Sequence, residues 1–317
     1  MTTAEAARSF PCFGAVAAVY VGGAGADGRP ADLVARIGQR QLTSLHSRLS
    51  RFAPGSELSL LNADPRETVP ASRLLRRLAA AVVEAATLSR GLVDGTMLGL
   101  LEQAGYADSR EGEPGLGAYA VLRDAPPRRP AGPASGRTWQ TIRVDDRAAT
   151  ITRTPGVRLD SGGIAKGMAA DLVGGTLRGH ASFAVDCAGD ILIGGTSGEP
   201  RRVRIDDPFG GGILDERAID SGAVATSGIG RRSWPMPGGG LGHHLLDPST
   251  GRPAYTGVVQ VTALAPTALE AEIRAKAALL SGPEGAASWL PGGGMVVLDD
   301  RSVEMVEAGT TENRLVP

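Results

Sequence analysis

Apolar residues recur with two different periods along this chain, and together the periods predict a mixture of helices and strands. Leucine and isoleucine recur every three to five positions within residues 32–49, which predicts an amphipathic helix. Residues 72–90 predict a second helix, with Ser72 as its N-cap and Gly91 just past its end. A third helix is predicted over residues 268–280.

Shorter stretches alternate apolar and polar residues and predict strands between these helices. The predicted strands cover residues 13–21, 141–144, 149–152, 183–186, 190–193, 202–205 and 258–263. Antiparallel strands mixed with helices favour an α+β fold, with mixed, largely antiparallel sheets and packed helices, over a doubly wound sheet. Residues 109–137 are rich in Pro, Gly and Arg, which predicts a loop or an insertion. No clean repeat is present.

Composition narrows the class of protein. A length of 317 residues suits one large domain or two lobes, and 42% hydrophobic content with a formal charge of −1 is typical of a soluble protein without a nucleic-acid or membrane partner. The first ten residues contain no apolar signal-like region, and no apolar run approaches a membrane span. Cys12 and Cys187 are too few and too far apart for a disulfide framework or a zinc site. We therefore expect a reduced, cytoplasmic protein.

The most informative passage is residues 159–167, where an apolar run ends in an aspartate, a glycine turn and a lysine before a helical pattern. A glycine turn that opens a helix directs backbone N–H groups and the positive end of the helix dipole to one point, which suits a phosphate. Lys166 lies in this turn, and the chain has only one other lysine, Lys276, among its 33 basic residues. The alternative is an ordinary helix start with a solvated lysine. The order of Gly and Lys differs from that of a P-loop.

Further short passages occur in a fixed order around this turn, and the set extends over nearly the whole chain. They are Ser50-Arg51-Phe52, residues 56–62 (SELSLLN), residues 91–96 (GLVDGT) with Gly105-Tyr106, residues 159–167 (LDSGGIAKG) with Asp171, residues 185–190 (VDCAGD), residues 225–228 (ATSG) and residues 244–251 (HLLDPSTG). Each motif is weak alone. The ordered set resembles the FAD:protein FMN transferase family, also called ApbE or flavin transferase.

The resemblance implies a two-lobed, single FAD-binding domain over residues 1–317 and a specific reaction. Members of the family cleave the FAD diphosphate and transfer FMN to a Thr or Ser hydroxyl of an acceptor flavoprotein, releasing AMP; some hydrolyse FAD to FMN and AMP instead. This chemistry needs a cradle for the diphosphate, a cation and a base. The residues carried over as FAD-binding are Phe13, Asn62, Asp94, Thr96, Ser161, Gly162, Gly163, Lys166, Asp190, Thr226, Ser227 and Gly228.

Two of the motifs allow a structural role beside the chemical one. His244 is the natural candidate for the base, because an imidazole titrates near neutral pH, but it could equally cap the turn at Asp247-Pro248. The hydroxyls of Thr226 and Ser227 could contact phosphate or ribose, or stabilise their own turn.

The last helix departs from the family pattern at the metal site. The family binds Mg²⁺ with an Asp and a Thr four residues apart and with a backbone carbonyl of the glycine turn, here Gly163. The alignment places Glu272 at the Asp position and Lys276 at the Thr position. An ammonium has no lone pair and cannot ligate a cation. Either the two side chains form an exposed helical pair, or, as we favour, Lys276 is buried in the site, takes part in the chemistry with Glu272 and makes Mg²⁺ use doubtful.

Milder departures indicate a divergent branch. Phe13-Gly14-Ala15 stands where Met-Gly-Thr is usual near the flavin, Gly95 replaces a Pro, Ala188 replaces a Gly and Ser161 replaces a Leu. Three functions therefore stay open: FMN transfer to an acceptor, which leads, FAD binding without transfer, and FAD pyrophosphatase activity. In each of them FAD is the expected ligand, in preference to FMN or a nicotinamide.

Overall fold

The computed structural model describes residues 5–23, 25, 28–123, 125–236 and 239–309, so the first four residues of the N-terminal segment considered above lie outside it. Its largest sheet has eight strands, and every neighbouring pair is antiparallel. In spatial order the strands are β1 (Ala6–Cys12), β2 (Ala15–Gly22), β6 (Ser182–Cys187), β7 (Asp190–Gly194), β10 (Gly222–Gly228), β15 (Val258–Ala265), β16 (Gly294–Leu298) and β17 (Val303–Val306).

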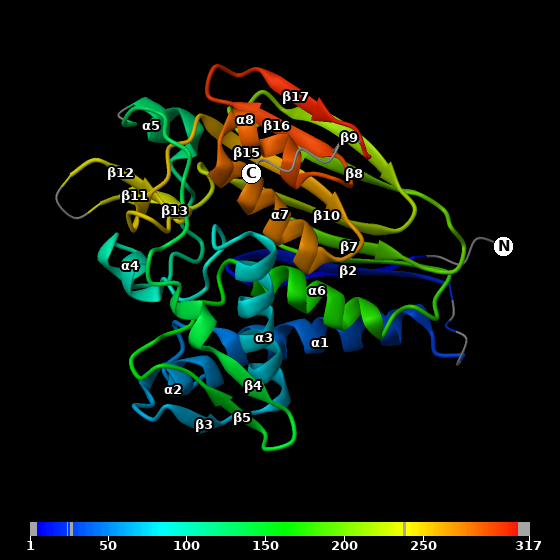
Figure 1. Cartoon of the computed structure of the whole chain (residues 1–317). Coiled ribbons are helices and arrows are strands. Elements are labelled where there is room, and N and C mark those ends of the chain that lie inside the picture. The colour runs from blue at the N-terminus through cyan, green and yellow to red at the C-terminus, as the bar shows by residue number, and fades with distance from the viewer. Residues whose placement is uncertain (1–4, 24, 26–27, 124, 237–238, 310–317) are drawn as a thin grey trace.

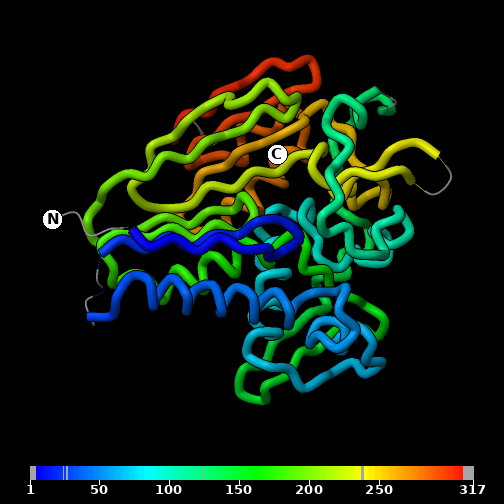
Figure 2. The backbone as a smooth tube through the Cα atoms, turned by 180° about the vertical axis from the view of Figure 1, so that it is seen from behind, coloured from blue at the N-terminus to red at the C-terminus, as the bar shows by residue number. Residues whose placement is uncertain are grey.

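Helices cover one face of this sheet. The helices in contact with it are α1 (Ala31–Leu49), α6 (Ala165–Gly175) and α7 (Ala268–Ser281), and α3 (Arg73–Leu88) packs against α6 and α7 from outside (Figure 1). The opposite face carries the two-stranded ribbon of β8 (Arg201–Asp206) and β9 (Ile213–Ile219), seen from behind in Figure 2. Apolar side chains of this ribbon, such as Val203 and Ile219, pack on the sheet residues Ala184, Ile193 and Val224.

Smaller elements form a second group beside α3 and a third group near the ends of the central strands. The second group, beside α3, contains α2 (Glu57–Ala63) and the three-stranded sheet β3-β5-β4, formed by Thr68–Pro70, Thr150–Thr152 and Arg143–Asp145. The third group, near the ends of the central strands, contains α4 (Leu98–Gln103), α5 (Gly117–Arg123), β11 (Ser233–Pro235), β12 (Leu241–His243), β13 (Leu246–Asp247) and β14 (Arg252–Pro253). Short pieces complete the chain: η1 (Thr138–Thr141), α8 (Pro283–Ala286) and η2 (Ala287–Trp289). This combination confirms the expected α+β class.

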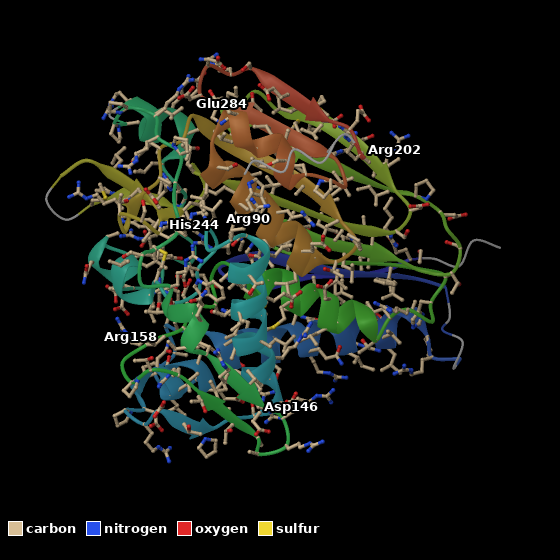
Figure 3. All side chains as sticks on the ribbon, viewed as in Figure 1. Arg90, Asp146, Arg158, Arg202, His244 and Glu284 are labelled. Atoms are coloured by element: carbon tan, nitrogen blue, oxygen red, sulfur yellow. The ribbon has the colours of Figure 1, made fainter. Side chains whose placement is uncertain are left out.

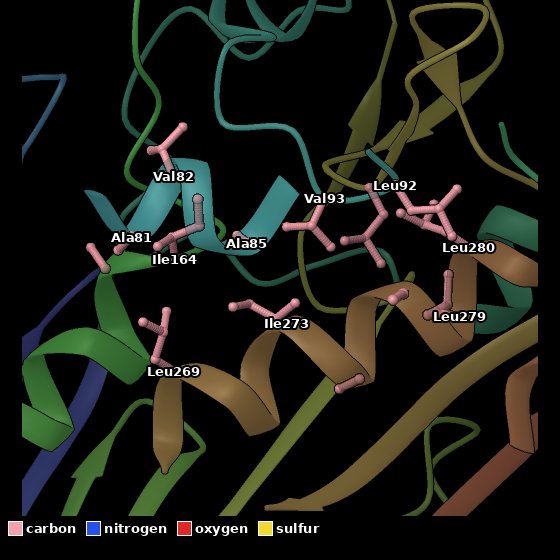
Figure 4. Close-up of a cluster of buried hydrophobic side chains, with 14 of the residues drawn as sticks. Ala81, Val82, Ala85, Leu92, Val93, Ile164, Leu269, Ile273, Leu279 and Leu280 are labelled. Carbon is pink, nitrogen blue, oxygen red and sulfur yellow. The ribbon is translucent and has the colours of Figure 1, made fainter. Parts of the chain in front are cut away.

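Helix α7 lies in the centre of the hydrophobic core. Eleven of its residues are buried, because the sheet lies on one side of it and α3 and the segment after α3 lie on the other. Figure 4 shows Ile164 reaching between α3 and α7, near Ile273 and Val82. The high alanine content of α7 allows these close approaches, since small side chains let neighbouring backbones come near.

Helix α6 is fixed against the start of α7 by two contacts. Asp171 accepts hydrogen bonds from the N–H groups of Ala268 (2.8 Å) and Leu269 (3.0 Å), so it caps α7. Gly167 faces the same turn, and a Cβ at this position would lie 2.5 Å from the carbonyl oxygen of Ala268. A side chain at residue 167 would therefore push the two helices apart.

The predicted elements agree with the structure where the periodic pattern of apolar residues extends over many positions. The three predicted helices are confirmed within two residues at each end, and Ser72 caps α3 through the N–H of Leu75. The strand predicted over residues 13–21 starts too early, because Phe13 and Gly14 form the positive-φ turn between β1 and β2. The predicted loop at residues 109–137 contains the helix α5. The prediction had no strand at β1, β9, β10, β16 or β17.

Candidate functional site

A cavity of about 400 Å³ opens where the ends of the central strands meet the start of α6 and the inner side of α7. Its lining collects most of the motif passages that are far apart in the sequence. Among the predicted residues, those that line it are Phe13, Asp94, Ser161, Gly162, Gly163, Lys166, Thr226, Ser227, Gly228, His244 and Lys276. Figure 3 labels His244 at this junction, between the α4 side of the molecule and α7.

The glycine turn forms one wall of the cavity and is held in place from behind. Asn62 exchanges two hydrogen bonds with the backbone of Leu159, at 2.8 and 2.7 Å. The hydroxyl of Ser161 donates to the carbonyl of Leu49 at 2.8 Å, and Asp160 accepts from the N–H of Gly162 at 3.1 Å. Asn62 thus lies outside the lining and orients the turn from behind, whereas the turn itself faces the cavity.

Beside the turn, two lysines and two carboxylates form a group of alternating charge, in which Lys166 is partly exposed and the other three side chains are buried. Lys166 donates a hydrogen bond to Asp190, and its Nζ lies 3.7 Å from Oε1 of Glu272. Lys276 donates to the same Glu272 oxygen at 2.9 Å. The other Glu272 oxygen accepts from the N–H of Gly167 at 2.9 Å. Part of the anion-binding capacity expected at the start of α6 is therefore already used by this chain's own carboxylate.

The pKa values of this group follow from burial and from the alternation of charge. Burial opposes the charge on Lys166, but the carboxylates of Asp190 and Glu272 outweigh it, so the pKa of Lys166 is raised. Burial likewise raises the pKa of Glu272, but Lys276 and Lys166 outweigh burial and hold that pKa below its usual value. The charged form of Asp190 is the least favoured of the four, because burial raises the pKa of its carboxyl despite the nearby Lys166.

The arrangement around Glu272 does not fit a divalent cation. Lys276 is 6% exposed and lies along the turn, with its Cε 3.5 Å from where a Cβ of Gly163 would be. Its ammonium thus occupies the space between Glu272 and the glycine turn, and it offers no lone pair. Both oxygens of Glu272 are already hydrogen-bonded. Among the described residues, no three His, Cys, Asp or Glu side chains cluster as a metal site. The buried position expected for Lys276 is confirmed, and the exposed helical pair is not observed.

His244 faces the cavity but differs from the expected imidazole in its acidity. Burial first, and then the neighbouring His243, Lys276 and Lys166, lower the pKa of His244 to about 3. Its ring is therefore neutral at pH 7, as a proton acceptor must be, but the premise that it titrates near neutral pH is wrong for the protein without ligand. Its Nδ1 lies 3.4 Å from the carbonyl oxygen of Arg232, a long contact that leaves Nε2 toward other partners.

The remaining predicted residues divide between the lining and its supports. Asp94 lines the cavity and accepts hydrogen bonds from the N–H and the hydroxyl of Thr96, at 2.8 and 2.6 Å, while burial raises its pKa. Thr96 therefore supports Asp94 from outside the lining. The hydroxyls of Thr226 and Thr262 are paired at 2.9 Å across β10 and β15. Asp190 and Glu272 lie behind the two lysines.

The sequence interpretation missed several residues that the structure brings to the cavity. Arg51 and Asp160 both line it and form a largely buried ion pair, with Arg51 Nε 3.2 Å from Asp160 Oδ1. The guanidinium of Arg51 also lies over the ring of Tyr106, 4.6 Å from its centroid. Arg231 and Arg232 line the same space. Arg51 and Tyr106 belong to the short motifs given in the sequence analysis and could have been identified there, but Arg231 and Arg232 belong to none of these motifs.

Comparisons with known proteins agree on one family. A model of the ApbE family matches residues 16–297. The FAD:protein FMN transferase of Treponema pallidum is 31% identical over 61% of this chain and 62% of that protein, and that of Rhodobacter capsulatus is 29% identical over 88% of this chain and 52% of that protein. The crystal structure of the ApbE protein of Thermotoga maritima superimposes with a TM-score of 0.76 at 25% identity, covering 96% of this chain and 97% of that one.

A second solved structure extends the similarity of fold. The apo form of the flavinyl transferase ApbE of Pseudomonas stutzeri gives a TM-score of 0.76 at 22% identity, covering 98% of this chain and 99% of that one. The alignments span only between half and two thirds of the two curated relatives. None of the helices described here is both long enough and apolar enough to cross a membrane.

Proposed function

The chain belongs to the ApbE family, and from this premise we propose that it binds FAD in the cavity and transfers the FMN moiety to a Thr or Ser hydroxyl of an acceptor flavoprotein, releasing AMP. One observation carries the proposal. The glycine turn of residues 159–167, the ATSG passage of β10 and the passage beginning at His244 are distant in sequence, yet they line one cavity. A cytoplasmic location stays a prediction.

The charges of the lining suit a diphosphate. Six of its side chains are basic and three are acidic: Arg51, Arg110, Lys166, Arg231, Arg232 and Lys276 against Asp94, Asp160 and Glu111. Asp190 and Glu272 lie behind the two lysines and offset two of these positive charges, so one excess positive charge remains to attract a dianionic diphosphate placed against the turn. We propose that Phe13, in the turn between β1 and β2, and Tyr106 contact the flavin ring, since both rings border the same cavity.

The chemistry that this lining can support is an in-line displacement at phosphorus. The acceptor hydroxyl oxygen forms a bond to the FMN-side phosphorus, the bond between this phosphorus and the bridging oxygen breaks, and AMP leaves. The hydroxyl proton passes to the neutral ring of His244. The two lysines that lower the pKa of His244 would be neutralised by the bound diphosphate, which raises its basicity when the substrate is present.

A specific observation favours a second candidate, FAD binding without transfer. Glu272 and Lys276 do not fit a divalent metal, so charge developing on the leaving AMP would be stabilised at this position by ammonium, guanidinium and backbone N–H groups. These donate hydrogen bonds but cannot bridge oxygens as a metal does. Slow transfer, or none, would be the consequence. Hydrolysis of FAD by water in place of the acceptor hydroxyl is the third outcome.

Mass spectrometry of FAD incubated with the protein and a Thr- or Ser-containing acceptor peptide separates these outcomes. AMP with FMN-peptide supports transfer, AMP with free FMN supports hydrolysis, and bound intact FAD supports the binding protein. Calorimetric titration with FAD, FMN and NAD tests the ligand. Affinity for NAD equal to or better than that for FAD would contradict the whole proposal.

A further inference from the structure

We propose that the ammonium of Lys276 is a built-in cation that replaces a divalent metal in holding the diphosphate, so that FAD binding by this chain requires no divalent cation. The inference rests on the proposed binding of FAD and adds how the diphosphate is held. It follows from the position of one side chain, from what surrounds it, and from a comparison with a second ion pair on the same helix.

Lys276 is directed inward from the centre of α7. Its side chain passes along Gly163 and lines the cavity, and its Nζ is anchored by Glu272, whose side chain is fully buried. Arg274 and Glu270 have the same spacing of four residues on the same helix, but their side chains are 17% and 29% exposed and Arg274 reaches the carbonyl of Trp289. Lys276 and Glu272 thus lie on the extensive buried side of α7, whereas Arg274 and Glu270 lie on its partly exposed side.

The anchoring leaves the ammonium able to bind a ligand. An ammonium has three donors, and one hydrogen bond to Glu272 still allows others toward phosphate oxygens. The second oxygen of Glu272 accepts a hydrogen bond from the N–H of Gly167 at the start of α6, which holds the carboxylate beside Lys276. Lys166 approaches the same carboxylate from the other side. The two ammonium groups are thus held at fixed positions beside the glycine turn, with Asp190 and Glu272 behind them.

This arrangement has a measurable consequence. A covalently attached charge is neither removed by chelators nor increased by added metal, so FAD affinity should be independent of both. Calorimetric titration of the wild-type protein with FAD in excess EDTA and in excess Mg²⁺ should give dissociation constants within about twofold of each other. An affinity more than tenfold higher with Mg²⁺ would overturn the inference, while the proposed FAD binding would stand. No FAD binding under either condition would overturn both.

Variants separate the charge of Lys276 from its contribution to packing. Lys276→Met keeps the length of the side chain and removes the charge, and we expect at least a tenfold loss of FAD affinity that Mg²⁺ does not restore. Riboflavin has no phosphate, so its affinity should change less than twofold in the same variant. The matched control, Arg274→Met on the outer side of α7, should bind FAD as the wild type does. Equal losses for FAD and riboflavin, or unchanged FAD affinity, would contradict the inference.

A direct readout of metal binding completes the test without relying on activity. Electron paramagnetic resonance of Mn²⁺ added to the protein alone should reveal no stoichiometric site in the wild type. The double substitution Glu272→Asp with Lys276→Thr restores the donor types of the family pattern and should create one Mn²⁺ site per chain. Stoichiometric Mn²⁺ binding by the wild type, or its absence from the double variant, would contradict the assignment of Lys276 to the position of the cation.

Discussion

Removing the charge of Lys276 should destabilise the fold far more than removing that of Arg274, although both residues form a pair with a glutamate four positions earlier. The Nζ of Lys276 lies 2.9 Å from Oε1 of Glu272, whose side chain is 0% exposed. Breaking a buried ion pair by removing one partner costs about 3–5 kcal/mol, because the remaining charge has no water to replace the lost partner. Lys166, 3.7 Å from the same oxygen, compensates in part, so we expect about 3 kcal/mol for Lys276→Met.

The control has the same sequence geometry in a different environment. Arg274 and Glu270 are partly exposed, and pairs of this kind contribute about 0.3–0.5 kcal/mol. With the additional contact from Arg274 to the carbonyl of Trp289, we expect Arg274→Met to cost about 1 kcal/mol or less.

A double-mutant cycle tests whether the cost comes from the pair. Glu272→Gln keeps an oxygen for the N–H of Gly167 but removes the charge, so Lys276→Met combined with Glu272→Gln should cost less than Lys276→Met alone. The assay is urea-induced unfolding at pH 7 followed by circular dichroism, comparing free energies of unfolding. Equal losses for Lys276→Met and Arg274→Met, or single costs that simply add in the double variant, would refute the reasoning.

Three further predictions concern the cavity and its frame. His244→Ala should lower the rate of AMP release about 10²-fold with little change in FAD affinity, whereas a large loss of affinity at unchanged turnover would favour a structural role. Burial lowers the pKa of His243 to about 4, whereas an unfolded histidine titrates near pH 6.5. The free energy of unfolding is therefore unaffected by this residue above about pH 6.5. It falls between pH 6.5 and 4 by up to roughly 1.4 kcal/mol per pH unit, because the unfolded chain binds a proton that the folded chain does not. Urea unfolding between pH 4 and 7 should therefore have a shallower pH dependence in His243→Gln, and an unchanged slope would contradict this. Gly167→Ala should destabilise by about 1–3 kcal/mol or more, because its Cβ would meet the carbonyl of Ala268; a melting temperature equal to that of the wild type would argue against the close contact of α6 and α7.

The sequence by itself determined the local structure and the family. Long helices of period 3.6 were located to within two residues, because their apolar faces and caps such as Ser72 are encoded by residues close together in the chain. The ordered motifs indicated the family, the glycine turn and the lysine at the start of α6. They also identified the positions of Glu272 and Lys276 as unusual. Short strands such as β1, β16 and β17 were missed, since four to seven residues at a sheet edge or in a buried interior give a weak periodic signal.

Only the tertiary structure decided where the unusual residues lie and what they contact. Spacing alone made Glu272 and Lys276 either an exposed pair or a buried one, and the packing of α7 between the sheet and α3 determined the buried arrangement. The pairing of Lys166 with Asp190, and the contact of Glu272 with the N–H of Gly167, join residues as many as 105 positions apart. Burial and neighbouring charges also set the low pKa of His244. Such properties depend on distances and solvent exclusion between remote segments, and these are fixed only when the chain has folded.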